Sequence, residues 1–143
     1  MGVWGEMYNF SMSLMSLEHG WANISIRDDV SSDTYMVSYV GPDALAGIVD
    51  TAIRLSRGQD SEIIFFLEPE KIPCWVKAQE DGTFLLSVQG LSFRGSSRRY
   101  IRQVLKMFDQ YMHTYGESEY VKQWHHPYPS GKLEMLRMLL HSE

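Results

Sequence analysis

The chain has 143 residues and a formal net charge of −5, and 44% of its residues are apolar. This length fits a single domain, and the composition is that of an ordinary globular protein. No apolar run approaches the roughly 20 residues of a membrane-spanning helix, and the N-terminus lacks the basic and apolar regions of a secretory signal. We therefore expect a cytoplasmic protein. Its single cysteine, Cys74, excludes an internal disulfide and a cysteine-based zinc cluster and reads as a small buried side chain.

Three strands are predicted at the start of the chain. Residues 10–17 alternate apolar and small polar side chains, which is typical of a half-buried strand. Residues 21–27 and 34–40 show the same alternation, and short polar turns separate the three segments. Short connections favour an antiparallel meander.

A helix should follow. Pro42 suits the first helical position, Asp43 complements the positive end of the helix dipole, and Gly58 ends the segment. The apolar positions recur at helical spacing, which predicts one buried stripe. Its members are Leu45, Ile48, Val49, Ala52 and Leu55.

The second half repeats this order of elements. The segment 62–67 contains a continuous apolar run from Ile63 to Leu67, as expected for a buried central strand, and residues 75–79 and 83–89 flank an Asp-Gly turn. A second long helix is predicted over residues 97–115, and Ser130 caps a short final helix. The prediction is one α+β domain, residues 1–143, in the order βββα-βββα. It has an antiparallel sheet of about six strands, two long helices and a short C-terminal helix.

Charge is unevenly distributed along the chain. Residues 1–93 carry a net charge of −8 and residues 94–143 a net charge of +3. Five cations lie close together in the second segment: Arg94, Arg98, Arg99, Arg102 and Lys106. On a helix Arg98, Arg102 and Lys106 form one exposed stripe. The stripe could bind phosphate, an RNA backbone or an acidic protein surface, or it could pair with the acids of the first half. The segment lacks the aromatic and glycine pattern of an RNA-recognition strand, so nucleic acid is not the favoured ligand.

Acidic residues gather around the central strands. Glu68 and Glu70 flank Pro69, and Glu80 and Asp81 occupy the predicted hairpin loop. Catalytic carboxylates need burial to raise one pKa, whereas such loops are exposed. These four residues are therefore interpreted as solvated acids or as an acidic recognition surface. Trp75 is the aromatic anchor expected for such a surface.

Catalytic motifs are missing from the sequence. His125 and His126 are adjacent, and no further ligand stands at a spacing typical of a zinc site. There is no Gly-x-Ser-x-Gly elbow and no glycine-rich phosphate loop. We predict no catalytic residue, metal or cofactor, and expect the segment from Trp124 to Tyr128 to pack against the last helix. An enzyme centred on that loop is a third possibility after protein binding and anion binding.

The order of elements resembles the small, acidic, single-domain immunity proteins that bacteria encode beside toxins. The resemblance rests on residues 65–70, which lead to the Trp75 hairpin after a capped helix and before a long closing helix. It covers residues 10–115. It implies a non-catalytic protein that neutralises a cognate bacterial toxin by stoichiometric binding. The acidity of the first half and the missing catalytic motifs make Glu68, Glu70, Trp75, Glu80 and Asp81 the predicted contact residues. The alternative is a nucleic-acid or phosphate-ligand binding module that uses Arg98, Arg102 and Lys106. Neither interpretation involves a membrane.

Overall fold

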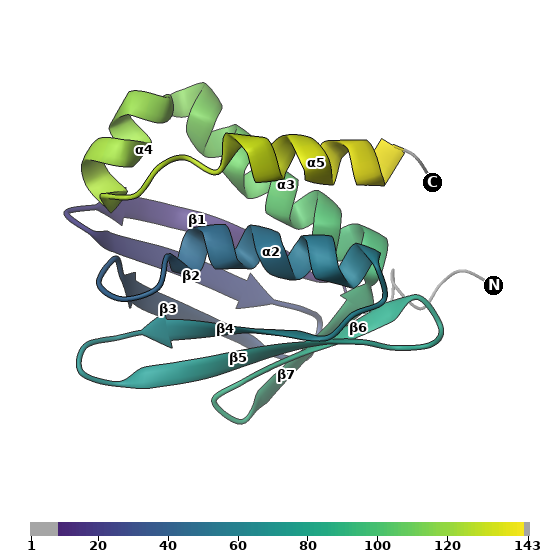
Figure 1. Cartoon of the computed structure of the whole chain (residues 1–143). Helices are drawn as coiled ribbons and strands as arrows, with labels where there is room; N and C mark the ends of the chain where they lie inside the picture. Colours follow the sequence, from purple (N-terminus) through teal and green to yellow (C-terminus); the bar gives the residue numbers. More distant parts are fainter. Residues whose placement is uncertain (1–8, 142–143) are drawn as a thin grey trace.

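The computed structural model describes residues 9–141 and contains two antiparallel sheets packed against helices (Figure 1). The first sheet has three strands in chain order: β1 (Ser11–Glu18), β2 (Trp21–Arg27) and β3 (Ser32–Ser38). The second has four, also in chain order: β4 (Ser61–Phe66), β5 (Lys71–Ala78), β6 (Thr83–Val88) and β7 (Leu91–Ser96).

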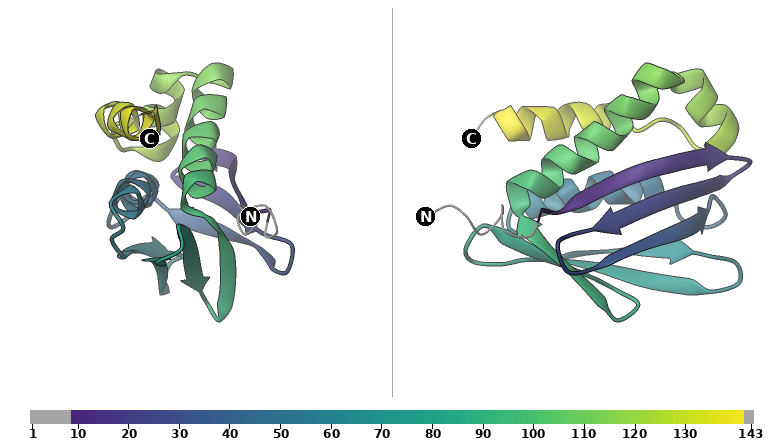
Figure 2. Two further views of the ribbon diagram at one scale, coloured as in Figure 1. Left: turned by 90° about the vertical axis from the view of Figure 1, so that its right-hand side faces the viewer. Right: turned by 180° about the vertical axis from the view of Figure 1, so that it is seen from behind.

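Four helices lie within residues 9–141: α2 (Ala44–Ser56), α3 (Ser97–Thr114), α4 (Glu117–Trp124) and α5 (Ser130–His141). The helix α2 packs on β4 and β5, α3 runs along β1, and α5 contacts both α2 and α3. The helices therefore form a layer on one side of the β4–β7 sheet, as Figures 1 and 2 show. No helix of the described chain is both long and apolar enough to cross a membrane.

The predicted α+β class and the antiparallel strands are confirmed, but the single six-stranded sheet is wrong. The seven strands within residues 9–141 divide into sheets of three and four, and the order is βββα-ββββα followed by two further helices. The break falls between β3 and β4, which lie near each other without sharing a ladder of hydrogen bonds. Side-chain packing joins the two strands instead. The ring centres of Tyr35 on β3 and Phe65 on β4 are 5.8 Å apart.

The strand that sequence analysis missed is β7. Its inward positions are Leu91, Phe93 and Gly95, of which Phe93 is fully buried and Leu91 partly buried, while Gly95 has no side chain to mark the face. The space above Gly95 is filled by other residues, since a Cβ atom there would lie 3.0 Å from both Phe10 and Phe84. Close packing therefore requires glycine at position 95, and this glycine interrupts the alternation of apolar and polar side chains by which a strand is recognised.

The helix α2 is held by the predicted stripe, and all five of its residues are buried. It begins at Ala44, two residues later than expected. Asp43 is the N-cap, and its carboxylate accepts a hydrogen bond from the Ala46 amide at 3.1 Å. Pro42 therefore lies before the helix rather than at its first position. The short aspartate side chain reaches the otherwise unpaired amides of the first turn, which explains the later start.

The helix α3 is anchored by one apolar face and a polar contact to α2. The Ser96 hydroxyl caps its start by accepting from the Arg99 amide. Tyr100 and Thr51, both buried, share a hydrogen bond of 2.8 Å between their hydroxyl groups. Because an unpaired buried hydroxyl is costly, this contact fixes how the two longest helices pack together.

Candidate binding surfaces

The outer face of the β4–β7 sheet, opposite α2, has no helix over it (Figure 2). Strand β5 alternates strictly, so Cys74 and Val76 point into the core while Trp75 and Lys77 face outward. The register places Glu62, Trp75 and Ser87 in one row across β4, β5 and β6. Trp75 keeps 46% of its surface exposed at the centre of this row.

Further apolar side chains surround Trp75 on the same face. Ile64 pairs with Pro73, Leu85 pairs with Lys77, and Lys71 lies 6.0 Å from the ring centre of Phe66. Ile64, Phe66 and Leu85 are each partly exposed. We call this surface the Trp75 face and define it by these residues: Glu62, Ile64, Phe66, Lys71, Pro73, Trp75, Lys77, Leu85, Ser87 and Arg94.

The outward side of the β1–β3 sheet has a different composition. One row is made of the small polar residues Ser13, Ser25 and Thr34, whereas Trp21, which is partly exposed, and Met36, which is 49% exposed, lie in other rows. Serine and threonine side chains hydrogen-bond readily with water and need no partner. The Trp75 face differs because further partly exposed apolar side chains, Ile64 and Leu85 among them, lie around its tryptophan.

The predicted acidic residues lie in two separate pairs around this face. Glu68 and Glu70 are in the turn between β4 and β5, and Glu80 and Asp81 are in the turn between β5 and β6. All four are exposed. The eight residues of β5 separate the two turns by roughly 26 Å at about 3.3 Å per residue. The structure therefore does not bring the four acids together, and Trp75 lies between the two pairs.

Asp81 also has a structural partner. Its carboxylate accepts hydrogen bonds from both the amide and the hydroxyl of Thr83. The hydroxyl bond is the main reason why the pKa of Asp81 is lowered. Asp81 thus helps to close the hairpin turn, whereas Glu68, Glu70 and Glu80 have no such bond among the described residues.

The basic cluster is divided by the fold. Arg99 donates to the carbonyl of Phe10, and Arg98 donates to the carbonyl of Leu140 at 3.3 Å, in the last turn of α5. A cation is favourable at that position because helix C-termini carry partial negative charge. Arg94 lies on β7, on the Trp75 face. Of the predicted stripe, only Arg102 and Lys106 remain exposed on α3.

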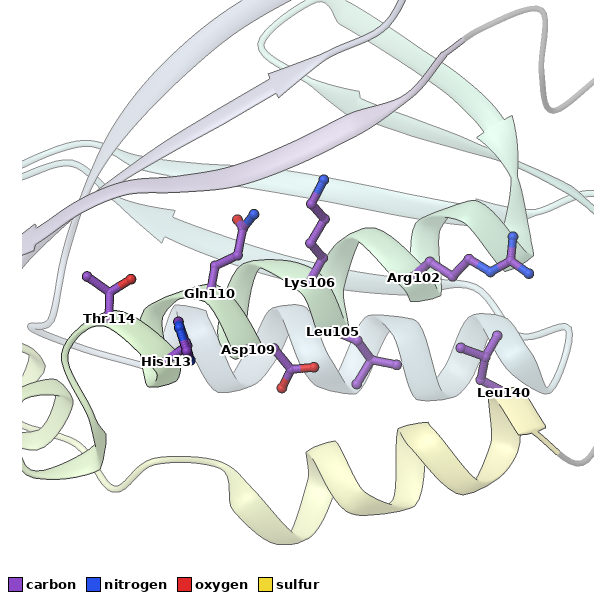
Figure 3. A pocket seen from close by; sticks show the side chains of 8 residues that line it. All are labelled: Arg102, Leu105, Lys106, Asp109, Gln110, His113, Thr114 and Leu140. Atoms are coloured by element: carbon purple, nitrogen blue, oxygen red, sulfur yellow. The ribbon is translucent and has the colours of Figure 1, made fainter.

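A shallow groove with a volume of about 750 Å³ adjoins these two cations (Figure 3). It is lined by Arg102, Leu105, Lys106, Asp109, Gln110, His113 and Thr114 of α3 and by Leu140 of α5. Leu105 and Asp109 lie on the side of α3 that faces α5, while Lys106 and Gln110 lie on the other side (Figure 3). We call this the α3–α5 groove. Sequence analysis identified its cations but missed Leu140, because the contact between α3 and α5 is not local in the chain.

Trp124 and the two histidines that follow it contact the residues at the start of α2. The buried Trp124 donates its indole N–H to Asp43 Oδ1 at 2.8 Å, and His126 Nε2 lies 2.8 Å from the carbonyl oxygen of Tyr39. The His125 ring packs against Tyr39 at 4.7 Å. These contacts are with residues at the start of α2, not with the last helix against which the segment was predicted to pack. No group of three potential metal ligands occurs among residues 9–141.

Cys74 is fully buried on the inward side of β5. Burial raises the pKa of its thiol to about 12, so the thiol stays protonated at neutral pH. Because the thiolate is the reactive form, Cys74 acts as a small apolar side chain, as predicted.

No protein-family model matches this sequence, and the chain matches neither a curated protein nor a solved structure.

Proposed function

We propose that this protein is a non-catalytic binding protein that neutralises a bacterial toxin by stoichiometric contact through the Trp75 face. One observation carries the proposal: Trp75, a large aromatic side chain, is 46% exposed at the centre of a sheet face that no helix covers. The resemblance to immunity proteins supports the choice of a toxin as partner.

The Trp75 face has the arrangement expected of a protein interface. Apolar side chains lie at its centre, and the charged residues Glu62, Lys71, Lys77 and Arg94 lie around them. Binding energy in such interfaces concentrates in a few aromatic anchors, and the polar rim contributes mainly to specificity. The acids at the two ends of β5 would attract a partner whose surface is basic there.

The exposed part of Trp75 sets the size of the expected effect. A tryptophan side chain buries up to about 250 Å², so roughly 100 Å² of Trp75 remains available to a partner. At about 25 cal/mol per Å², this area contributes about 2.5 kcal/mol to binding. Trp75→Ala should therefore weaken binding roughly 60-fold.

Co-purification of the chain with the product of the adjacent gene tests the proposal, followed by calorimetric titration of the complex. Trp75→Ala should abolish co-purification or weaken the affinity by the stated factor. Tyr115→Ala is the matched control, because Tyr115 is 63% exposed but lies at the end of α3, away from the Trp75 face. If the neighbouring gene encodes no toxin-like domain and its product does not bind, the proposal fails.

Charge gives a second measurement on the same complex. Glu68→Gln combined with Glu70→Gln should slow association with a basic partner, and added salt should reduce the difference from wild type. An unchanged association rate would show that the acids at this end of β5 do not face the partner.

A further inference from the structure

The α3–α5 groove carries positive charge that no ion pair within residues 9–141 neutralises. The carboxylates on α2, α3 and α5 are Asp50, Asp109 and Glu134, and each lies within ion-pair distance of Lys132 or Arg137. Among residues 9–141, no acidic side chain forms an ion pair with Arg102 or Lys106. The sequence prediction left open whether the stripe pairs with acids of the first half. Within the described part of the chain these two cations do not, although the chain as a whole has a net charge of −5.

The groove also offers an apolar contact beside its cations. Leu105 and Leu140 line it where α3 meets α5, and His113, Gln110 and Thr114 extend it toward the end of α3. From Arg102 to Thr114 the groove follows α3 for about 18 Å, at 1.5 Å per residue. That length equals about three helical turns, and the two cations are about one turn, roughly 6 Å, apart.

We propose that the α3–α5 groove binds an acidic, helix-forming segment of a partner protein, at a site separate from the Trp75 face. Carboxylates four residues apart on such a segment are also one turn apart, so they match the spacing of Arg102 and Lys106. Apolar residues between the carboxylates would meet Leu105 and Leu140.

The lining residues favour a polypeptide over a nucleic acid. Apart from His113, no ring lines the groove on which a base could stack, and single-stranded nucleic acids rely on such stacking. The carboxylate of Asp109 also lines the groove, where it would repel phosphates. An acidic peptide can place a neutral or basic residue opposite Asp109, whereas every nucleotide of a nucleic acid brings a phosphate.

Fluorescence anisotropy with three labelled probes tests this proposal. The first probe is a helix-forming peptide with glutamates four residues apart and leucines between them. The second is the same peptide with glutamine in place of glutamate, and the third is a single-stranded DNA oligonucleotide. The protein variants are Arg102→Glu with Lys106→Glu and, as a matched control, Arg54→Glu with Arg57→Glu. The control makes the same change in charge on exposed cations of α2 and its C-cap, outside the groove.

Binding of the glutamate peptide but not the glutamine peptide is expected. The Arg102/Lys106 variant should bind about tenfold more weakly and the control variant like wild type. Trp75→Ala should leave peptide binding unchanged, so this test can fail or succeed independently of the proposed toxin contact. The proposal is overturned if the glutamate peptide does not bind or if both double variants weaken it equally. Binding of DNA alone, lost in the Arg102/Lys106 variant, would make the groove a nucleic-acid site instead.

Discussion

Asp43 carries two hydrogen bonds at once, and its replacement by alanine should remove both. Its Oδ1 atom accepts from the Ala46 amide and from the indole N–H of Trp124. Loss of an N-cap costs about 1 kcal/mol. Trp124 is fully buried, so its N–H would be left without a partner at a cost of about 1–3 kcal/mol. His126 Nδ1 lies 4.0 Å from Asp43 Oδ2 and is partly exposed, so it adds little.

We therefore expect Asp43→Ala to lower the free energy of unfolding by about 2–4 kcal/mol, measured by urea denaturation followed by circular dichroism. Asp43→Asn is the control, because its side-chain oxygen can accept both bonds, and it should cost clearly less. The dependence of the free energy on urea concentration should be the same in all variants, as expected for a change in stability alone.

A double-mutant cycle separates the two contributions of Asp43. Trp124→Phe removes the indole N–H, so in that background Asp43→Ala should cost only the cap, about 1 kcal/mol. An equal cost of Asp43→Ala in both backgrounds would show that the indole bond does not stabilise the fold. A cost well below about 1 kcal/mol in the wild-type background would refute the capping role as well.

Glycine substitutions and a thiol reaction test two further features, the turn between β1 and β2 and the buried cysteine. Gly20→Ala should destabilise the fold by about 1–3 kcal/mol in the same urea assay, because φ is +81° and the new Cβ would overlap the Tyr39 ring. Gly131→Ala, in α5 with no atom within 4 Å of its Cβ position, should be neutral or stabilising, and an equal loss at both sites would contradict the steric argument. Ellman's reagent at about pH 8 should react slowly with native Cys74 and rapidly in concentrated guanidinium chloride, since the buried thiol is protonated. Because the pKa of this thiol is raised in the folded state, its contribution to stability is complete below about pH 9 and is lost as the pH rises toward 12. A fast native reaction would show that Cys74 is accessible.

Sequence patterns predicted the elements whose signals are local. The stripe of α2 and the alternation of β5 depend on residues close together in the chain, and both are confirmed by burial. The division into two sheets could not be predicted in this way. It depends on whether β3 and β4, which are separated by α2, form a ladder, and no residue pattern within either strand records that.

The candidate surfaces show the same limit. The exposed position of Trp75 follows from the alternation of β5, so it was predictable. The different roles of Arg98, Arg99 and Arg102 could not be predicted from the sequence. Arg98 and Arg99 donate hydrogen bonds to carbonyl groups that belong to distant parts of the chain. Helical spacing alone made the cations look equivalent. Only the packing of α5 and of the segment before β1 distinguishes them.

The two proposed sites lie on opposite layers of the molecule, which constrains how they can act together. The Trp75 face is the side of the β4–β7 sheet away from the helices, and the α3–α5 groove lies on the helical layer (Figure 1). A flat interface on one layer leaves the other accessible, so one partner would have to wrap around the domain to reach both. Sites this far apart with no shared contacts contribute additively to binding. If one partner uses both, the free-energy losses of Trp75→Ala and of the Arg102/Lys106 variant should sum in the combined variant. If two partners are involved, each substitution should weaken one complex and leave the other unchanged.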